Sequence, residues 1–243
     1  MGTMNPLVVV TASFYGKGKE NQRPAARPLR GVPAAPPFEG VQYKLFTNNP
    51  EKAKGKGWEI ILVEQEKDLR LKAREIKSNI HTFFPDASEW LWVDSNMKIV
   101  ENPRVLASKY LKVHSLVAMP HHCRSNYWQE VNEICAQPHL CSLGQGPPAR
   151  EAGKRYRNEG HMPIGLYETG CLLRRNCKEV VEFNKTWWNE IKHRSIRDQV
   201  SFTYAAWKTG LAINSFPGSN KERNKAPPTF KYLPVWKEII RAW

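Results

Sequence analysis

Short apolar runs along the chain predict a series of buried strands. Five of them lie in the first half of the chain: "PLVVVTASFYG", "VQYKLFTNN", "GWEIILVEQ", "EWLWVD" and "HSLVAMP". Their β-branched and aromatic residues fit buried strands, and turn-forming or charged residues separate one run from the next. The first run is continuously apolar until it ends in small and aromatic residues.

Helical spacing of apolar residues appears between and after these runs. Residues 68–84, "DLRLKAREIKSNIHTFF", show it most clearly, with Arg74 and Lys77 on a face beside the apolar one. Pro85 is expected to end this helix. Its predicted buried stripe consists of Leu69, Ala73, Ile76, Ile80 and Phe83. Further helices are predicted at "WQEVNEICAQ", "KEVVEFNKTWWNEIKH" and "IRDQVSFTYAAWKTG".

Strands that alternate with helices predict an α/β fold with a largely parallel sheet. We expect residues 1–243 to form a single domain, because no internal repeat or composition break divides them. Five prolines from Pro24 to Pro37 predict a surface loop over residues 17–40. Residues 211–243 are expected to form a C-terminal extension. Its end, "FKYLPVWKEIIRAW", has the pattern of an amphipathic helix that docks on the domain or contacts a partner or membrane surface.

The charge balance favours an anionic partner. The chain has 37 Lys and Arg against 23 Asp and Glu, a net charge of +14. Nucleic acid, an anionic surface or a phosphorylated small molecule would suit this charge, and so would a merely solvated surface. The basic residues are spread along the chain without a run of five or six, so nucleic acid is not the expected partner.

Hydropathy and cysteine content predict a soluble cytoplasmic protein. No apolar stretch of about 18 residues predicts a transmembrane helix, and the N-terminal apolar run is too short for a signal peptide. The five cysteines are an odd number without the density of a disulfide framework, which suits a reducing compartment.

Several classes of enzyme are disfavoured by missing motifs. The chain has no G-x-x-x-x-G-K-[ST] loop, no G-x-G-x-x-G after the first strand and no G-x-S-x-G elbow. Their absence disfavours kinases, P-loop ATPases, dehydrogenases and serine hydrolases. The segment "HHCRSNYWQEVNEICAQPHLC" contains three histidines and three cysteines, but their spacing fits no common zinc finger or ribbon. Buried thiols with surface histidines are the favoured interpretation over a structural zinc.

Carboxylates beside apolar segments are the candidate chemical groups. In "EWLWVDSNMKI" the apolar run stops at Asp94, and polar residues at the carboxyl end of a strand lie where open α/β sheets bind ligands. An ordinary turn is the alternative. Glu168 precedes "CLL", and Asp198 opens the helix "RDQVSF". A loop carboxylate with a local hydrogen bond and a helix-start acid favoured by the dipole are the alternatives for these two.

Three blocks resemble a family of glycosyltransferase-like domains: "WVDSN", "YETGCLLRR" and "WWNEI…SIRDQVSF". The family was long described only as a domain of unknown function, and it includes plant mucilage-polysaccharide glycosyltransferase-like proteins with bacterial and viral members. The resemblance covers roughly residues 7–208, without the Pro-rich insert and the tail after Gly210. It implies the GT-A class: a single α/β/α domain with a Rossmann-like sheet, which transfers sugar from a nucleotide-sugar donor, UDP- or GDP-linked, to a hydroxyl of a glycan or other acceptor.

The resemblance also implies a set of site residues. Nucleotide-sugar contacts are expected from Thr11, Ser13, Phe14, Tyr15, Arg74, Lys77, Asp94, Ser95, Asn96 and Arg124. A divalent cation, Mn²⁺ or Mg²⁺, is expected at Asp94, Asn96 and His121. Asn96 stands where many GT-A enzymes have a second Asp, so the cation can be dispensable, with Arg74 and Lys77 supplying the positive charge.

The catalytic residues implied by the resemblance are Asp198 and Glu168. If the reaction inverts the anomeric centre, one of them takes the proton from the acceptor hydroxyl, and "RDQ" favours Asp198. If the reaction retains the configuration, the leaving phosphate can take that proton. Two other classes of function stay open: a polyanion- or nucleic-acid-binding module that has lost catalysis, and a hydrolase that uses Asp94, Glu168 and Asp198 as a carboxylate site.

Overall fold

The computed structural model describes most of the chain. The described residues are 5–15, 32, 34–53, 55–64, 67–95, 97, 99, 101–138, 140 and 144–216. Most of the predicted Pro-rich loop over 17–40 lies outside them, as does the predicted C-terminal extension beyond residue 216.

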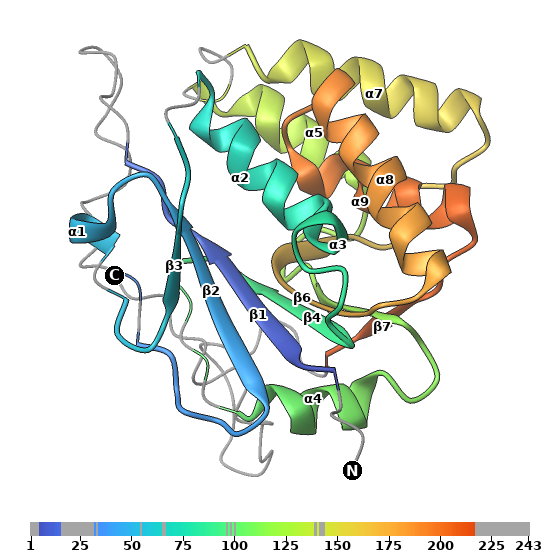
Figure 1. Ribbon diagram of the computed structural model, residues 1–243. Coiled ribbons are helices and arrows are strands. Elements are labelled where there is room, and N and C mark those ends of the chain that lie inside the picture. The colour runs from blue at the N-terminus through green and yellow to red at the C-terminus, as the bar shows by residue number, and fades with distance from the viewer. Residues whose placement is uncertain are drawn as a thin grey trace, which may run out of the picture.

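Seven strands of the described residues form one sheet in the order β3-β2-β1-β4-β6-β5-β7 (Figure 1). The strands are β1 Leu7–Ala12, β2 Val41–Thr47, β3 Glu59–Leu62, β4 Glu89–Val93, β5 Leu116–Pro120, β6 Tyr167–Arg175 and β7 Ile213–Ser215. Neighbours pair in parallel except at β6, which is antiparallel to both β4 and β5. The predicted α/β class with a mainly parallel sheet is confirmed, and the five expected runs are β1 to β5.

Helices cover both faces of this sheet (Figure 1). They are α1 Pro50–Ala53, α2 Leu69–Ser78, α3 Ile80–Phe83, α4 Pro103–Tyr110, α5 Tyr127–Ala136, α7 Gly146–Asn158, α8 Lys178–His193 and α9 Asp198–Thr209. Helix α4 packs on one face, and α2, α8 and α9 pack on the other. Within the described residues, no helix has the length and apolar character needed to span a membrane.

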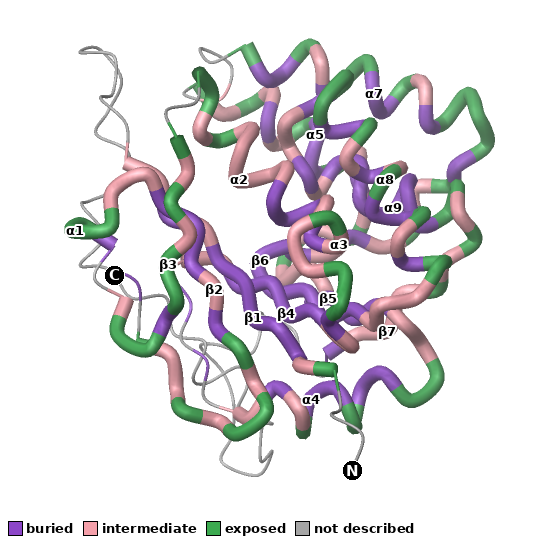
Figure 2. The backbone as a smooth tube through the Cα atoms, viewed as in Figure 1, coloured by how far each residue is buried: buried purple, intermediate pink, exposed green. Residues whose placement is uncertain are grey.

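The strands are apolar on both sides because both faces of the sheet are covered. Val9 and Leu91 point to the side of α4, whereas Val8, Val10 and Trp90 point to the side of α2, α8 and α9. Figure 2 shows the central strands as the buried middle of the molecule. A third apolar cluster joins α5, α7 and α9 beside the sheet.

The predicted helix over 68–84 is divided in two at Asn79. Asp68 caps its start by accepting hydrogen bonds from the backbone N–H groups of Arg70 and Leu71. Near its end the Ser78 hydroxyl donates to the carbonyl of Arg74 at 2.7 Å, a local bond that competes with helical pairing. Arg74 and Lys77 could also have formed a solvated helix face, but Lys77 is 1% exposed, so this does not hold for it.

The strand order reverses between β1 and β4. The chain moves outward from β1 through β2 to β3, and then returns to place β4 on the opposite side of β1. The loops after these two strands therefore diverge, which opens the crevice where α/β sheets bind ligands. Because β6 runs antiparallel, its beginning lies at the same edge: the Asp94 N–H donates to the carbonyl of Gly170 at 2.8 Å. Glu168, weighed above as a loop carboxylate, is instead part of a strand.

Candidate functional site

A buried charged cluster lies at the carboxyl ends of β1 and β4. Its centre is the Lys77 ammonium of α2, which donates to Asp198 Oδ2 at 2.7 Å and to Thr169 Oγ1 at 3.0 Å. Lys77 Nζ also lies 3.7 Å from Asp94 Oδ1. Four elements, α2, β4, β6 and α9, therefore bring their charged or polar ends together at one point.

Asp198 is almost completely buried in this cluster, at 3% exposure. Arg74 Nη1 lies 3.2 Å from its Oδ2, and the Thr169 hydroxyl donates to the same oxygen at 2.7 Å. Burial alone would raise the pKa of Asp198, but the charges of Arg74 and Lys77 and the two hydrogen bonds hold that pKa well below its usual range. The carboxylate is therefore ionised at neutral pH and is a weak proton acceptor.

A buried arginine in β6 fixes the end of helix α2. The Arg174 guanidinium donates from Nη2 to the carbonyl of Lys77 at 2.8 Å and from Nη1 to Asn184 Oδ1 at 2.7 Å. Burial lowers the pKa of Arg174 to about 9. On the other side, the Trp187 indole donates to the carbonyl of Asp198 at 3.0 Å, which holds the start of α9. Hydrogen bonds to their backbone carbonyls thus hold both Lys77 and Asp198, the partners of the central ion pair, in place.

Asp94 forms the more open side of the cluster, with a side chain 40% exposed. The Trp92 indole donates to its Oδ1 at 2.9 Å. Gly170 lies directly beside it: a Cβ atom there would lie 3.1 Å from Asp94 Oδ2 and 2.6 Å from Met97 Cε. The glycine of "YETG" therefore makes room for the carboxylate.

Replacing Gly170 by alanine is expected to cost about 1 kcal/mol of unfolding free energy, because the new methyl group displaces the flexible tip of Met97 and crowds Asp94 Oδ2. Urea denaturation followed by circular dichroism measures this. Gly153→Ala is the matched control, since its Cβ would make an ordinary 3.4 Å contact with Trp128 inside helix α7. Equal stability of Gly170→Ala and the wild type would contradict the proposed tight fit.

The loop after β1 is fixed to the end of β2. Asn48 binds both sides of the Tyr15 backbone, accepting from its N–H at 2.9 Å and donating to its carbonyl at 2.8 Å. Thr11 and Ser13 are buried, and Phe14 and Tyr15 are partly exposed. Of the predicted nucleotide contacts on this loop, only Phe14 and Tyr15 therefore present substantial side-chain surface.

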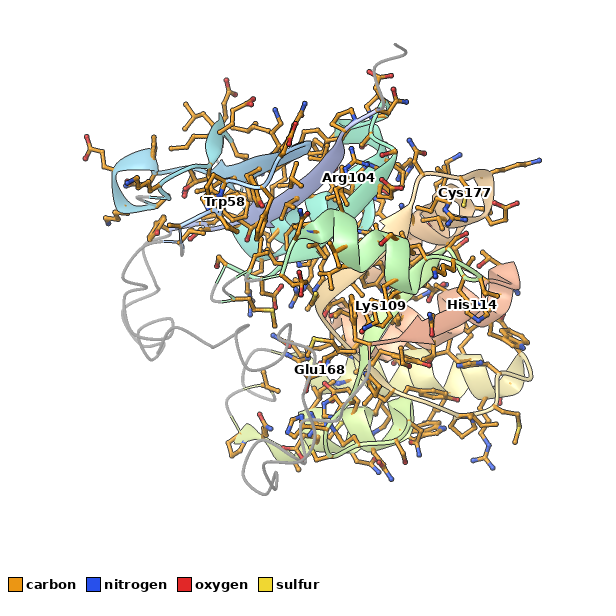
Figure 3. All side chains as sticks on the ribbon, turned by 90° about the horizontal axis from the view of Figure 1, so that it is seen from below. Trp58, Arg104, Lys109, His114, Glu168 and Cys177 are labelled. Atoms are coloured by element: carbon orange, nitrogen blue, oxygen red, sulfur yellow. The ribbon has the colours of Figure 1, made fainter. Side chains whose placement is uncertain are left out.

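Two histidines after β5 form the second part of the site. Glu168 Oε1 lies 2.6 Å from His122 Nδ1. The ring of the neighbouring His121 stacks on that of His122, but its polar contacts are with Arg124. Its Nδ1 accepts from the backbone N–H of Arg124 at 3.1 Å, and its Nε2 lies 3.0 Å from Arg124 Nη2. Burial, and then the charge of Arg124, lower the pKa of His121 to about 4, so this ring is neutral. Glu168 is labelled in Figure 3.

The Arg124 side chain forms an ion pair with the buried Glu130. Its Nε lies 2.7 Å from Glu130 Oε2, and Arg197 Nη2 lies 2.8 Å from the other oxygen of the same buried carboxylate. The resemblance implied a nucleotide-sugar contact from Arg124. In the structure the Glu130 carboxylate of α5 joins Arg124 to Arg197, which lies just before α9.

The described residues do not complete a cation site around Asp94. Asn96 lies outside them, and the group of possible metal ligands found among them does not include Asp94. The donor atoms of His121, His122 and Cys123 do lie within 4.8 Å of one another. The other members of the Cys/His segment add nothing to this group: Cys135 Sγ contacts the carbonyl of Gly146, and residues 139 and 141 lie outside the described residues.

The structure thus brings Arg74, Lys77, Asp94 and Asp198 together and places Glu168 with His122. Sequence reasoning did not single out four residues that hold this arrangement: Asn48, His122, Thr169 and Arg174. The available signal was a polar residue at the end of, or inside, an otherwise apolar strand. Ser95 follows Asp94 in the turn and is partly exposed.

A layered α/β domain with a charged cluster where the strand order reverses belongs to the broad class of ligand-binding α/β domains. The model of the TOD1/MUCI70 glycosyltransferase-like domain matches residues 42–224. The chain therefore belongs to this glycosyltransferase-like family, which confirms the resemblance. The match extends past Gly210, where the resemblance was expected to end, and begins after β1 rather than at residue 7.

The chain is also similar to a curated plant protein, the "Probable hexosyltransferase MUCI70" of Arabidopsis thaliana. The two are 24% identical over an alignment of 178 residues, and the alignment covers 65% of this chain. The matched segment spans only 30% of the plant protein.

Proposed function

We propose that this protein is a glycosyltransferase that moves a sugar from a nucleotide-diphosphate donor, a UDP- or GDP-sugar, to a hydroxyl of a glycan or other acceptor. The observation that carries this is the charged cluster of Arg74, Lys77, Asp94 and Asp198 at the reversal of strand order. Membership of the glycosyltransferase-like family and the GT-A resemblance support it.

The donor diphosphate faces Arg74 and Asp94 in this proposal. Arg74 is 28% exposed and contacts Asp198 through Nη1, so the rest of its guanidinium fork can donate to phosphate oxygens. Lys77 does not face the donor; its buried charge holds Asp94 and Asp198 in place. Phe14 and Tyr15, both partly exposed after β1, are the proposed contacts of the nucleoside.

The acceptor proton goes to Glu168 rather than to Asp198. Asp198 is buried among two cations and a hydroxyl, with a depressed pKa, so it is a poor base. Glu168 contacts His122, whose side chain is 41% exposed, at the same edge of the sheet. The Glu168 side chain is 10% exposed against 4% for Asp198, so it is the more accessible of the two carboxylates.

A thermal-shift screen against UDP-, GDP-, CDP-, dTDP- and ADP-sugars, with and without Mn²⁺, tests the donor site. One nucleotide class is expected to raise the melting temperature, since a ligand at a hundred times its Kd stabilises by about 2.7 kcal/mol. Asp94→Ala is expected to abolish the shift, and Asp86→Ala, in an exposed turn, to keep it. Comparison of the two metal conditions tests the predicted cation.

The other classes of function give different results. No shift with any donor under either condition would refute the donor site and favour the binding module, which would show salt-steep affinity for RNA, DNA or another polyanion. Donor cleavage that is independent of any acceptor would favour the hydrolase.

A further inference from the structure

A pocket with a volume of about 350 Å³ lies next to the candidate site. The segment between α7 and β6, helix α9 and the start of β7 surround it. The lining residues that matter here are His161, Met162, Ile164, Tyr167, Thr203 and Trp207.

The pocket combines aromatic surface with a small polar group. Trp207 is 43% exposed and Ile164 is 76% exposed, so apolar side chains reach solvent at its rim. Deeper in, the buried His161 and Thr203 share a hydrogen bond at 3.3 Å between Nε2 and Oγ1. Burial lowers the pKa of His161, which keeps its ring neutral.

The pocket carries no formal charge: of the described residues that line it, none is Asp, Glu, Lys or Arg. This is the opposite of the cluster around Lys77, and it disfavours a diphosphate or any phosphorylated ligand. A neutral ligand with one apolar face and several hydroxyl groups matches the lining, because binding pockets combine apolar walls with a few placed polar groups.

Tyr167 connects the pocket to the candidate site along the chain. This residue directly precedes Glu168 in β6, and its carbonyl accepts from Gln199 Nε2 at 3.4 Å, next to Asp198. Helix α9 then runs from Asp198 to Thr209, which carries Trp207 roughly 13 Å along the helix axis from Asp198. A ligand that reaches both ends is therefore longer than one sugar ring.

We propose that this pocket binds a neutral sugar ring of an oligosaccharide acceptor, away from the hydroxyl that reacts. The C–H face of the ring packs on Trp207 and Tyr167, and its hydroxyl groups bond to His161 and Thr203. This inference rests on the proposed function and specifies its acceptor as an extended, uncharged glycan segment.

The test is calorimetric titration of the full chain with neutral hexa-saccharides of α- and β-linked hexoses and of xylose. At least one is expected to bind. Trp207→Ala is expected to weaken that binding about tenfold, which is about 1.4 kcal/mol, because it removes the aromatic surface on which the ring packs. Thr203→Val, which keeps the shape and removes the hydroxyl, is expected to weaken it too. Val113→Ala, an exposed apolar residue elsewhere, is the control.

The donor-induced thermal shift separates this inference from the proposed function. It is expected to be the same in Trp207→Ala as in the wild type. A donor shift without any oligosaccharide binding, or binding unchanged in Trp207→Ala, would overturn the sugar pocket and leave the transferase intact. Two other results would also overturn the sugar pocket if no sugar binds. One is binding of the apolar dye ANS that Trp207→Ala abolishes. The other is a dimer, seen in sedimentation, that Trp207→Ala abolishes.

Discussion

Replacing Asp198 by asparagine is expected to lower the free energy of unfolding by about 3–5 kcal/mol, because it leaves a buried cation without its partner. Lys77 is 1% exposed, and Asp198 Oδ2 is its nearest acceptor at 2.7 Å. Urea denaturation at pH 7 measures the loss. Asp86→Asn, in an exposed turn, removes a carboxylate of the same kind and is expected to change little.

A double variant distinguishes a buried ion pair from simple packing. Lys77→Met combined with Asp198→Asn removes both charges and is expected to be more stable than Asp198→Asn alone. Arg74 stays in both variants, so its 3.2 Å contact does not account for the difference. A loss below 1 kcal/mol in Asp198→Asn would mean that water or another group already compensates Lys77.

The pH dependence has a definite sign. Because the folded state holds the pKa of Asp198 below the usual Asp value of about 3.9, the ionised carboxylate stabilises the folded state above that value. This contribution is lost as the pH falls through the lower pKa of the folded state. The difference in stability between the wild type and Asp198→Asn is therefore expected to be constant from pH 5 to 7 and to shrink below about pH 4.

Local patterns predicted the strands and helices better than the connections between them. The apolar runs at β1 and β4 required cover on both faces, and the structure supplies it. Helical periodicity placed α2 but could not show that Lys77 is buried, since its counter-ion lies 121 positions further along the chain. A cation beside an apolar stripe has the same pattern in a solvated helix and in a buried one.

The site was predictable where a single strand end defines it. Asp94 interrupts an apolar run, and this alone indicates the edge of a sheet. The antiparallel direction of β6 depends on long-range pairing, so the sequence did not show that Glu168 and Thr169 begin a strand beside β4 and β5. Helix α7, which begins with two prolines compatible with a helix start, had no counterpart among the predicted helices.

Replacing Glu168 by glutamine is expected to lower kcat/KM for sugar transfer about 10²–10⁴-fold, the usual size of a lost general base. Glutamine keeps the shape of the side chain and can still contact His122, but it cannot take a proton. Initial rates with the donor identified by thermal shift measure the effect. Glu182→Gln, on the exposed side of α8, is the control.

The same variant decides between the two routes for the acceptor proton. If Glu168 is the base, Glu168→Gln keeps the donor-induced thermal shift and loses transfer, because donor binding depends on Arg74 and Asp94. If transfer falls less than tenfold while donor binding persists, Glu168 is not the base, and the leaving phosphate is the remaining acceptor of the proton. Because Asp198 is already held ionised by Arg74 and Lys77, it cannot readily replace Glu168 in that role.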